Sequence, residues 1–222
     1  MSEKEKLLNL IRVSDTFFPI GSFAVSQGME QVINENLVPK AKLGKAINVY
    51  LEKIWKNFDL QIFSHALKAT KAADIKTLSK IDEICYSAKI TEENRTAMTR
   101  MGHNMISASE FKQSSTGATY KNLIKQDKVR GTYPVVLAVV SHELGLNDLG
   151  AISLIYVNLM EVIASLVRMG HIDYIEAQRF LEENIKSINI VTAEICDFNQ
   201  SFPMIDIASM RHEISPNRMF IS

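Results

Sequence analysis

The five histidines are the side chains of this sequence best suited to metal binding or proton transfer: His65, His103, His142, His171 and His212. They are scattered along the chain and form no HExxH pair, in which two histidines share one helix face. His142-Glu143 and His212-Glu213 are direct neighbours, and their side chains would diverge by about 100° on a helix. We therefore expect each histidine to be an ordinary core or surface residue rather than a ligand.

Two other local patterns contain reactive residue types. Ser141-His142-Glu143 has the residues of a hydrolase triad, but adjacent helical positions do not converge as a triad must. The segment GSFAVSQG, residues 21–28, has two glycines without the Lys-Ser or Lys-Thr pair that a nucleotide-binding P-loop requires. The sequence therefore predicts no catalytic group, no resident metal and no nucleotide site.

Composition limits the classes of partner. The chain of 222 residues has 25 basic and 25 acidic residues, so no overall field attracts nucleic acid or anionic lipid. Cys85 and Cys196 are the only cysteines and form no CxxC pair, which favours a reducing, cytoplasmic location. The most apolar stretch, residues 151–169, contains Glu161 near its middle, and this charge would be costly in a bilayer. We interpret that stretch as a buried core helix.

The elements that position these residues are predicted to be helices. Apolar residues recur at steps of three and four over residues 43–62 and again over 75–85, the spacing of one helix face. Thr91 is expected to cap a helix that runs through residue 106, whereas the polar stretch 113–130 is expected to be a mobile or partly helical connection.

The second half of the chain continues the pattern. Pro134 is expected to begin a buried helix that ends near residue 145, although the run VVLAVV (135–140) taken alone also suits a buried strand. Asn147 or Asp148 is expected to cap a helix over 149–169, and Asp173 to cap one that reaches residue 195. We predict an all-α bundle with residues 1–222 in a single domain.

Two terminal stretches stand out. In TFFPIGSFAVSQGME (16–30), Pro19 favours an extended approach and Gly21 allows a tight turn, which predicts that Phe18 and Phe23 enter the core. The chain ends DIASMRHEISPNRMFIS (206–222), where apolar residues on one helix face accompany two arginines. This ending is either a peptide-like docking segment or an arm folded back on its own domain.

At these stretches the sequence resembles the UreF family of urease accessory proteins. The N-terminal signature P-[IV]-G-[SG]-F-x-x-S-x-G-[LM]-E is matched by residues 19–30 through Pro19, Gly21, Phe23, Ser26, Gly28 and Glu30. The terminal signature D-[IL]-A-S-M-x-H-E followed by R-[LM]-F-x-S is matched by residues 206–213 and 218–222. The similarity spans essentially the whole chain.

The resemblance implies an all-helical, dimeric cytoplasmic chaperone without cofactor or catalytic activity. Its implied partners are UreD (also called UreH), the GTPase UreG and apo-urease, with residues 203–222 as the docking tail and nickel as the cargo. The implied contacts are Asp206, Ser209, Met210, Arg211, His212, Glu213, Arg218 and Phe220, together with Arg168 at the end of an apolar helix, where its charge also suits the helix dipole.

Two other functions remain open at this level. The buried helices could enclose a small-ligand or enzymatic pocket with Glu161 or Tyr156 as its polar groups. Alternatively, His212 could bind nickel directly with His171 or Cys196. Purified protein without a bound nucleotide or metabolite would argue against the pocket, and equilibrium dialysis without stoichiometric nickel would argue against direct nickel binding.

Overall fold

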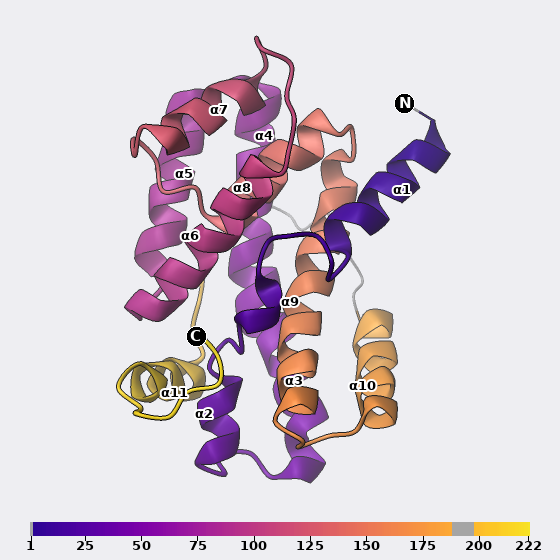
Figure 1. Ribbon diagram of the computed structural model, residues 1–222, viewed down its shortest axis with the longest axis vertical. Helices are drawn as coiled ribbons and strands as arrows, with labels where there is room; N and C mark the ends of the chain where they lie inside the picture. The colour runs from indigo at the N-terminus through magenta and orange to yellow at the C-terminus, as the bar shows by residue number, and fades with distance from the viewer. Residues whose placement is uncertain (1, 188–197) are drawn as a thin grey trace.

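The computed structural model describes residues 2–187 and 198–222, and in this part of the chain the fold is helical and has no strand (Figure 1). The all-α prediction is confirmed. The helices are α1 (Glu3–Ser14), α2 (Met29–Asn34), α3 (Leu43–Tyr50), α4 (Leu60–Lys71), α5 (Ile75–Ala88), α6 (Glu92–Ser107), α7 (Thr116–Lys125), α8 (Tyr133–Glu143), α9 (Gly150–Arg168), α10 (Tyr174–Ser187) and α11 (Pro203–Glu213).

The helix predicted over residues 43–62 is part of a longer rod. A π-helical segment, Leu51–Asp59, joins α3 directly to α4, so the rod continues from Leu43 to Lys71. Its wider turns carry the buried Trp55 and Phe58.

The predicted caps are partly confirmed. Thr91 accepts a hydrogen bond from the Asn94 amide at 3.2 Å, and Asp173 accepts from the Glu176 amide at 2.7 Å. The cap predicted at Asn147 or Asp148 is wrong, because both residues lie in a 3₁₀ turn that leads into α9 without a side-chain cap. The predicted continuation of α10 to residue 195 falls partly outside the described residues.

The segment 135–140 is helical, so the strand alternative is wrong. Pro134 lies in the first turn of α8, and every residue from Tyr133 to Ser141 is buried among helices. In such surroundings a strand would leave its backbone hydrogen-bonding groups without partners, whereas a helix pairs them internally. The preceding polar stretch is partly helical, since it contains α7.

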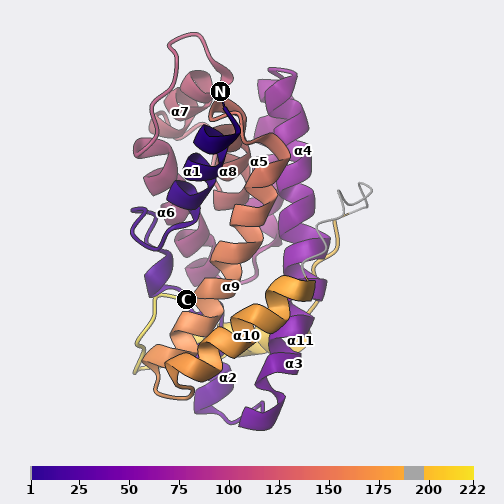
Figure 2. The same cartoon turned by 90° about the vertical axis from the view of Figure 1, so that its right-hand side faces the viewer.

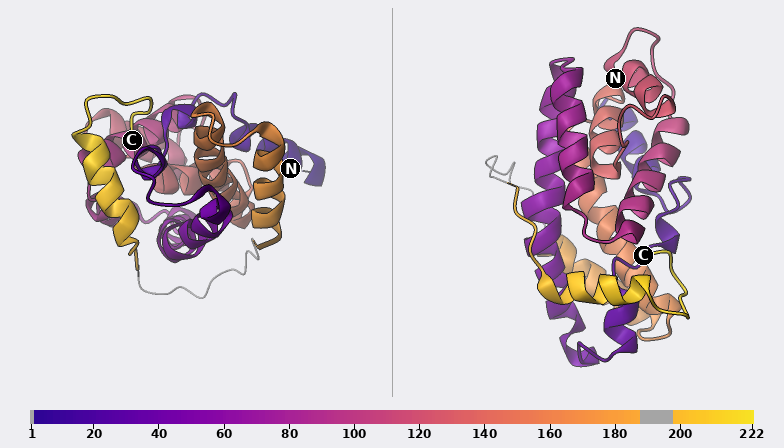
Figure 3. Two further views of the ribbon diagram at one scale, coloured as in Figure 1. Left: turned by 90° about the horizontal axis from the view of Figure 1, so that it is seen from below. Right: turned by 90° about the vertical axis from the view of Figure 1, so that its left-hand side faces the viewer.

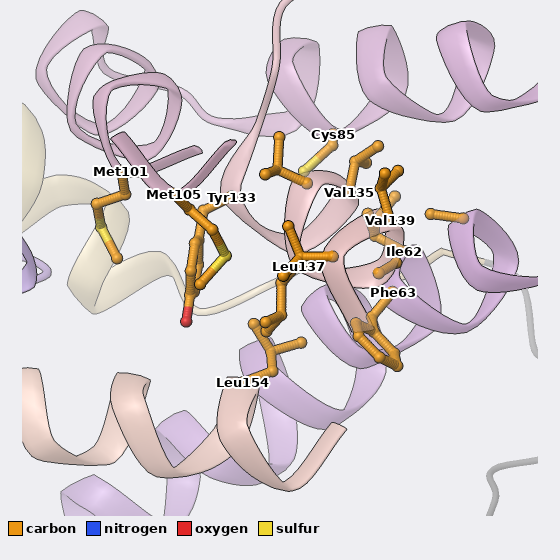
Figure 4. Packing of buried hydrophobic residues seen from close by; sticks show 14 of the residues in the cluster. Ile62, Phe63, Cys85, Met101, Met105, Tyr133, Val135, Leu137, Val139 and Leu154 are labelled. Carbon is orange, nitrogen blue, oxygen red and sulfur yellow. The ribbon is translucent and has the colours of Figure 1, made fainter. Parts of the chain in front are cut away.

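The buried side chains form two clusters. The first surrounds α8 and includes side chains of α4, α5 and α6 (Figure 4). The second lies among α2, α3, α9, α10 and α11. Leu154 of α9 belongs to the first cluster and Leu159 to the second, so one helix contributes to both.

The apolar stretch Asn147–Arg168 is long and apolar enough to cross a membrane, but 72% of its most apolar window is buried inside the fold. It therefore has the environment of a core helix, as the sequence predicts. Figure 2 shows α9 running through the molecule, with α1 and α10 on its outer side.

The C-terminal residues lie against the N-terminal motif, residues 19–30. Helix α11 lies across the lower part of the molecule, in contact with α2 and α6 (Figure 3). The tail, residues 203–222, then returns to the loop that precedes α2. Of the two alternatives for the tail, this structure has the arm folded back on its own chain.

Candidate functional site: the N-terminal motif and the C-terminal tail

The N-terminal motif, residues 19–30, forms a seat for the tail. Gly21 and Gly28 have φ angles of +82° and +80°, a left-handed conformation that glycine adopts without a steric penalty. A Cβ on Gly28 would lie 2.6 Å from Ser209 Oγ, so glycine also lets α11 approach α2 closely. Both signature glycines thus shape the seat.

The last residues of the chain bind this seat through backbone hydrogen bonds. The Ser222 carbonyl accepts bonds from both the amide and the hydroxyl of Ser26, each at 2.7 Å. The Ile221 amide donates to the Ala24 carbonyl at 2.9 Å. Ser26 and Ser222 are buried, so these bonds fix the position of the chain end.

Glu30 is the central acceptor of the seat. Its carboxylate is buried and accepts hydrogen bonds from the Met219 amide at 2.7 Å, the Phe220 amide at 3.0 Å and His212 Nε2 at 2.8 Å. Hydrogen bonds to a charged acceptor are about twice as strong as neutral ones. One signature residue at the start of the chain therefore binds three groups of the other signature.

His212 lies between two carboxylates. Its Nδ1 atom is 2.8 Å from Glu93 Oε2 of α6, while Nε2 faces Glu30. Each ring nitrogen of the buried His212 side chain thus has a carboxyl oxygen within hydrogen-bond distance. Arg218 also pairs with Glu93, and this group of Glu30, Glu93, His212 and Arg218 is the Glu30 cluster.

Glu213, the neighbour of His212, has a different role. Its carboxylate accepts from the amides of Glu92 at 2.9 Å and Glu93 at 3.3 Å, in the first turn of α6. These amides have no partner within their own helix, so Glu213 caps α6 from another element. The tail thereby contacts α6 as well as α2.

Arg168 binds the tail from the end of α9. Its guanidinium lies between two rings, 4.2 Å from the Phe23 centroid and 4.5 Å from the Phe220 centroid, and it donates to the Phe23 carbonyl. A planar cation stacks favourably on aromatic faces. Phe220 is buried by this arrangement, so in this structure its pocket is provided by its own chain.

The prediction that Phe23 enters the core is wrong, because its side chain is 58% exposed. The 3₁₀ turn Ser22–Ala24 lies over the end of α9, where the ring covers Arg168 instead of apolar side chains. Phe18 does pack against the first cluster, as predicted, and Pro19 is exposed in the turn before Gly21.

The predicted contact residues divide between two environments. Ser209, His212 and Phe220 are buried, and Asp206 is half-buried, with the pKa of its carboxyl raised by burial. The outer surface of the tail carries the others, with Arg211 paired to Glu35. Glu213 is half-buried, whereas Met210, Arg211 and Arg218 are exposed. Three further residues of the tail are also exposed: Ile207, Ile214 and Met219.

The structure contains a cavity that corresponds in part to the predicted small-ligand pocket. A cavity of about 90 Å³ lies between the tail and the body, and Glu161 lines it whereas Tyr156 does not. Burial raises the pKa of Glu161 to about 8, against the lowering effect of a hydrogen bond from Gln27.

For the nickel-binding alternative, the described residues contain no group of side chains arranged as metal ligands. Across residues 2–187 and 198–222, no three His, Cys, Asp or Glu side chains converge as metal ligands. Both ring nitrogens of His212 are engaged by carboxylates, and Cys196 lies outside the described residues.

Sequence reasoning missed Glu93 as a partner of the tail. In the sequence, Glu93 is simply an acidic residue in the first turn of α6. Acidic residues are common there because they interact favourably with the helix dipole, so this position gave no sign of a tail contact. Gln27 was also missed as a binding residue, although it lies inside the N-terminal motif. Its amide donates to Glu161 at 2.7 Å.

Comparison with known proteins agrees with the two motifs. A family model described as UreF matches residues 38–184. The urease accessory protein UreF of Bacillus sp. (strain TB-90) is 29% identical, covering 98% of this chain and 99% of that protein. Proteins of the same name from Trichodesmium erythraeum (strain IMS101) and Photorhabdus laumondii subsp. laumondii are 24% and 27% identical, and each alignment covers at least 97% of both chains. The family model spans more than half of the chain, and the relatives extend over both termini; the chain belongs to the UreF family.

Proposed function

We propose that this protein is a urease-maturation scaffold that binds UreD (UreH) and recruits the GTPase UreG, so that GTP hydrolysis is coupled to nickel insertion into apo-urease. Membership of the UreF family gives it an accessory role in urease maturation rather than an enzymatic one. The named partners, the nickel cargo and a cytoplasmic location belong to this proposal.

The observation that carries the proposal is the outer face of the tail. Ile207, Met210 and Ile214 are 49%, 52% and 83% exposed and follow each other at steps of three and four on α11 and its end. Arginines at 211 and 218 flank this apolar face. Apolar anchors beside arginine are typical of protein interfaces.

The buried face of the same helix supports the proposal by presenting the outer one rigidly. Ala208 and His212 face inward, and the Glu30 cluster with the Arg168 stack fixes the end of the tail. A surface held in one conformation loses little entropy when a partner binds. We therefore assign the recruiting surface to the exposed residues of the tail and a positioning role to the buried ones.

A capture experiment with purified partners tests the recruiting surface. The double variant Met210→Glu/Ile214→Glu should lower retention of UreG by the complex with UreD at least tenfold, since each apolar anchor contributes about 1.5–3 kcal/mol when buried. Ile175→Glu on α10 is the matched control, because Ile175 is 56% exposed on another helix. Equal retention by the double variant and the control would refute the assignment.

Substitutions are more informative here than deletion of the tail. Ile205, Ala208 and Phe220 are buried against the body, so a truncated chain would expose its core. Loss of binding by the truncated chain would then report damage to the fold as readily as loss of a contact.

We further propose that the protein is a homodimer, joined through a partly exposed apolar stripe of α9. Ile152, Tyr156, Met160, Ala164 and Val167 follow at steps of three and four, are not fully buried, and include no charged residue. The chain carries no net formal charge, so two copies do not repel each other overall. A stripe of this kind can pack against its own copy about a two-fold axis.

Analytical ultracentrifugation tests the dimer. Wild-type protein should sediment as a dimer and Met160→Glu as a monomer, because a charge would be buried without a partner. Ile90→Glu serves as the control, since Ile90 is exposed between α5 and α6. A monomeric wild type, or a dimeric Met160→Glu variant, would contradict the proposed interface.

A further inference from the structure

The cavity between the tail and the body is lined by residues from distant parts of the chain. Ile205, Asp206 and Ser222 contribute from the tail, and Tyr133 and Glu161 contribute from α8 and α9. Its volume of about 90 Å³ exceeds that needed for one water molecule. The tail therefore forms one side of a small cavity that contains polar groups, while its Ala208 and Phe220 side chains are buried against the body.

Glu161 is the least satisfied acid in this space. It is 5% exposed; its Oε2 accepts from Gln27 Nε2 at 2.7 Å, and its Oε1 has no hydrogen-bond partner within the described residues. The side-chain oxygen of Gln27 accepts from Trp55 Nε1 at 3.0 Å, which directs the Gln27 amide group toward Glu161. The identified partner of the carboxyl is thus a neutral amide.

The lysine of the cavity is engaged elsewhere. Lys89 Nζ lies 3.1 Å from Asp59 Oδ1 and 3.2 Å from Gln200 Oε1. The remaining titratable side chains that line the cavity with Glu161 are Asp59, Asp206, Tyr50 and Tyr133, none of which is a cation. Burial, with a contribution from the negative charge of Asp59, accordingly raises the pKa of Glu161 to about 8.

The cavity also contains groups suited to a protonated carboxyl. Tyr133 Oη and Ser222 Oγ are buried and have no hydrogen-bond partner in the described part of the chain. A protonated carboxyl is a donor, and a water molecule in the cavity can relay its hydrogen bond to these hydroxyls. An ionised carboxylate would instead be held in a site without an available cation.

We propose that docking of the tail keeps a proton on Glu161 and that displacement of the tail releases this proton to solvent. The tail supplies Ile205, Asp206 and Ser222 to the wall of the cavity, so its departure would give the carboxyl access to water. Water stabilises the ionised form, and the tail consequently docks more weakly as the pH rises. This coupling is a property of the isolated chain and goes beyond the proposed recruitment of partners.

The Ile221 amide reports tail docking without titrating, because its acceptor is the Ala24 carbonyl. Hydrogen exchange of this amide should be followed from about pH 5 to about pH 9 in full-length wild type and in Glu161→Gln, and expressed as protection factors to remove the intrinsic pH dependence. Glutamine retains the shape of the protonated acid and cannot ionise. The His212 imidazole is present in both proteins, so the ratio of the two curves isolates Glu161.

The wild-type protection factor should fall relative to that of Glu161→Gln by about tenfold per pH unit until the pH reaches about 8, then level off. Parallel curves would overturn the proposal. Carbon-13 NMR of wild-type side-chain carboxyls gives a second measurement that needs no variant. Glu161 should remain protonated at neutral pH, and its ionisation below about pH 5, the ordinary range of a glutamate, would also overturn the proposal.

Neither measurement includes UreG or UreD. Failure of the capture experiment would therefore leave the proton coupling standing, and failure of the exchange experiment would leave the recruiting surface standing.

Discussion

Replacing Glu30 with alanine is expected to release the C-terminal tail while leaving the helical body folded. The carboxylate is 4% exposed and accepts three hydrogen bonds, from His212 Nε2 at 2.8 Å and from the amides of Met219 at 2.7 Å and Phe220 at 3.0 Å. Alanine would leave one ring nitrogen of the buried His212 and the amides of Met219 and Phe220 without this partner.

The magnitude follows from these contacts. A hydrogen bond to a charged group contributes about 1.5–3 kcal/mol, and the alanine variant loses three bonds to the Glu30 carboxylate. These contributions overlap, and part of the lost free energy is recovered when the released groups are hydrated. We therefore expect the free energy of tail docking to become less favourable by about 4 kcal/mol. Because 1.4 kcal/mol changes an equilibrium constant tenfold, the population of molecules with an undocked tail should rise by nearly three orders of magnitude.

Hydrogen exchange of the Ile221 amide measures this change, because its acceptor, the Ala24 carbonyl, remains in place. Circular dichroism checks that the helices persist. Glu35→Ala is the matched control: it removes the exposed ion pair with Arg211 on the same side of α11, and exposed pairs contribute little. If Ile221 exchanges equally slowly in Glu30→Ala and wild type, the Glu30 cluster does not hold the tail and our reasoning is refuted.

Three further substitutions test other parts of the structure. Arg168→Lys keeps the charge but loses the planar stack and should increase Ile221 exchange about tenfold; unchanged exchange would show that charge alone suffices. Gly28→Ala should lower the Tm more than Gly170→Ala, since both have positive φ but only Gly28 lies against Ser209; equal Tm values would contradict the close approach. Asp82→Ala should destabilise the fold by about 3 kcal/mol in urea unfolding, because its buried carboxylate accepts three hydrogen bonds before α8; a loss below about 1 kcal/mol would argue against this role.

The sequence alone predicts the helices where the deciding interactions are local. Thr91 and Asp173 cap helices as expected, because a cap joins residues two or three positions apart. The apolar spacing over residues 43–62 likewise specifies one helix face. The same reasoning fails at Asn147, where the chain makes a 3₁₀ turn in place of a side-chain cap.

The sequence also marks both ends of the chain as unusual, but it leaves open whether the tail is free or folded back. That choice depends on Glu30 and Met219, which are 189 positions apart and bonded at 2.7 Å. It also depends on Arg168, which draws Phe23 out of the predicted core position and covers Phe220. Periodicity and capping describe only neighbours along the chain, whereas the fit of charges and rings from distant segments exists only once the helices have packed. The tertiary structure therefore decides which tail residues are buried to hold it and which are exposed to contact a partner.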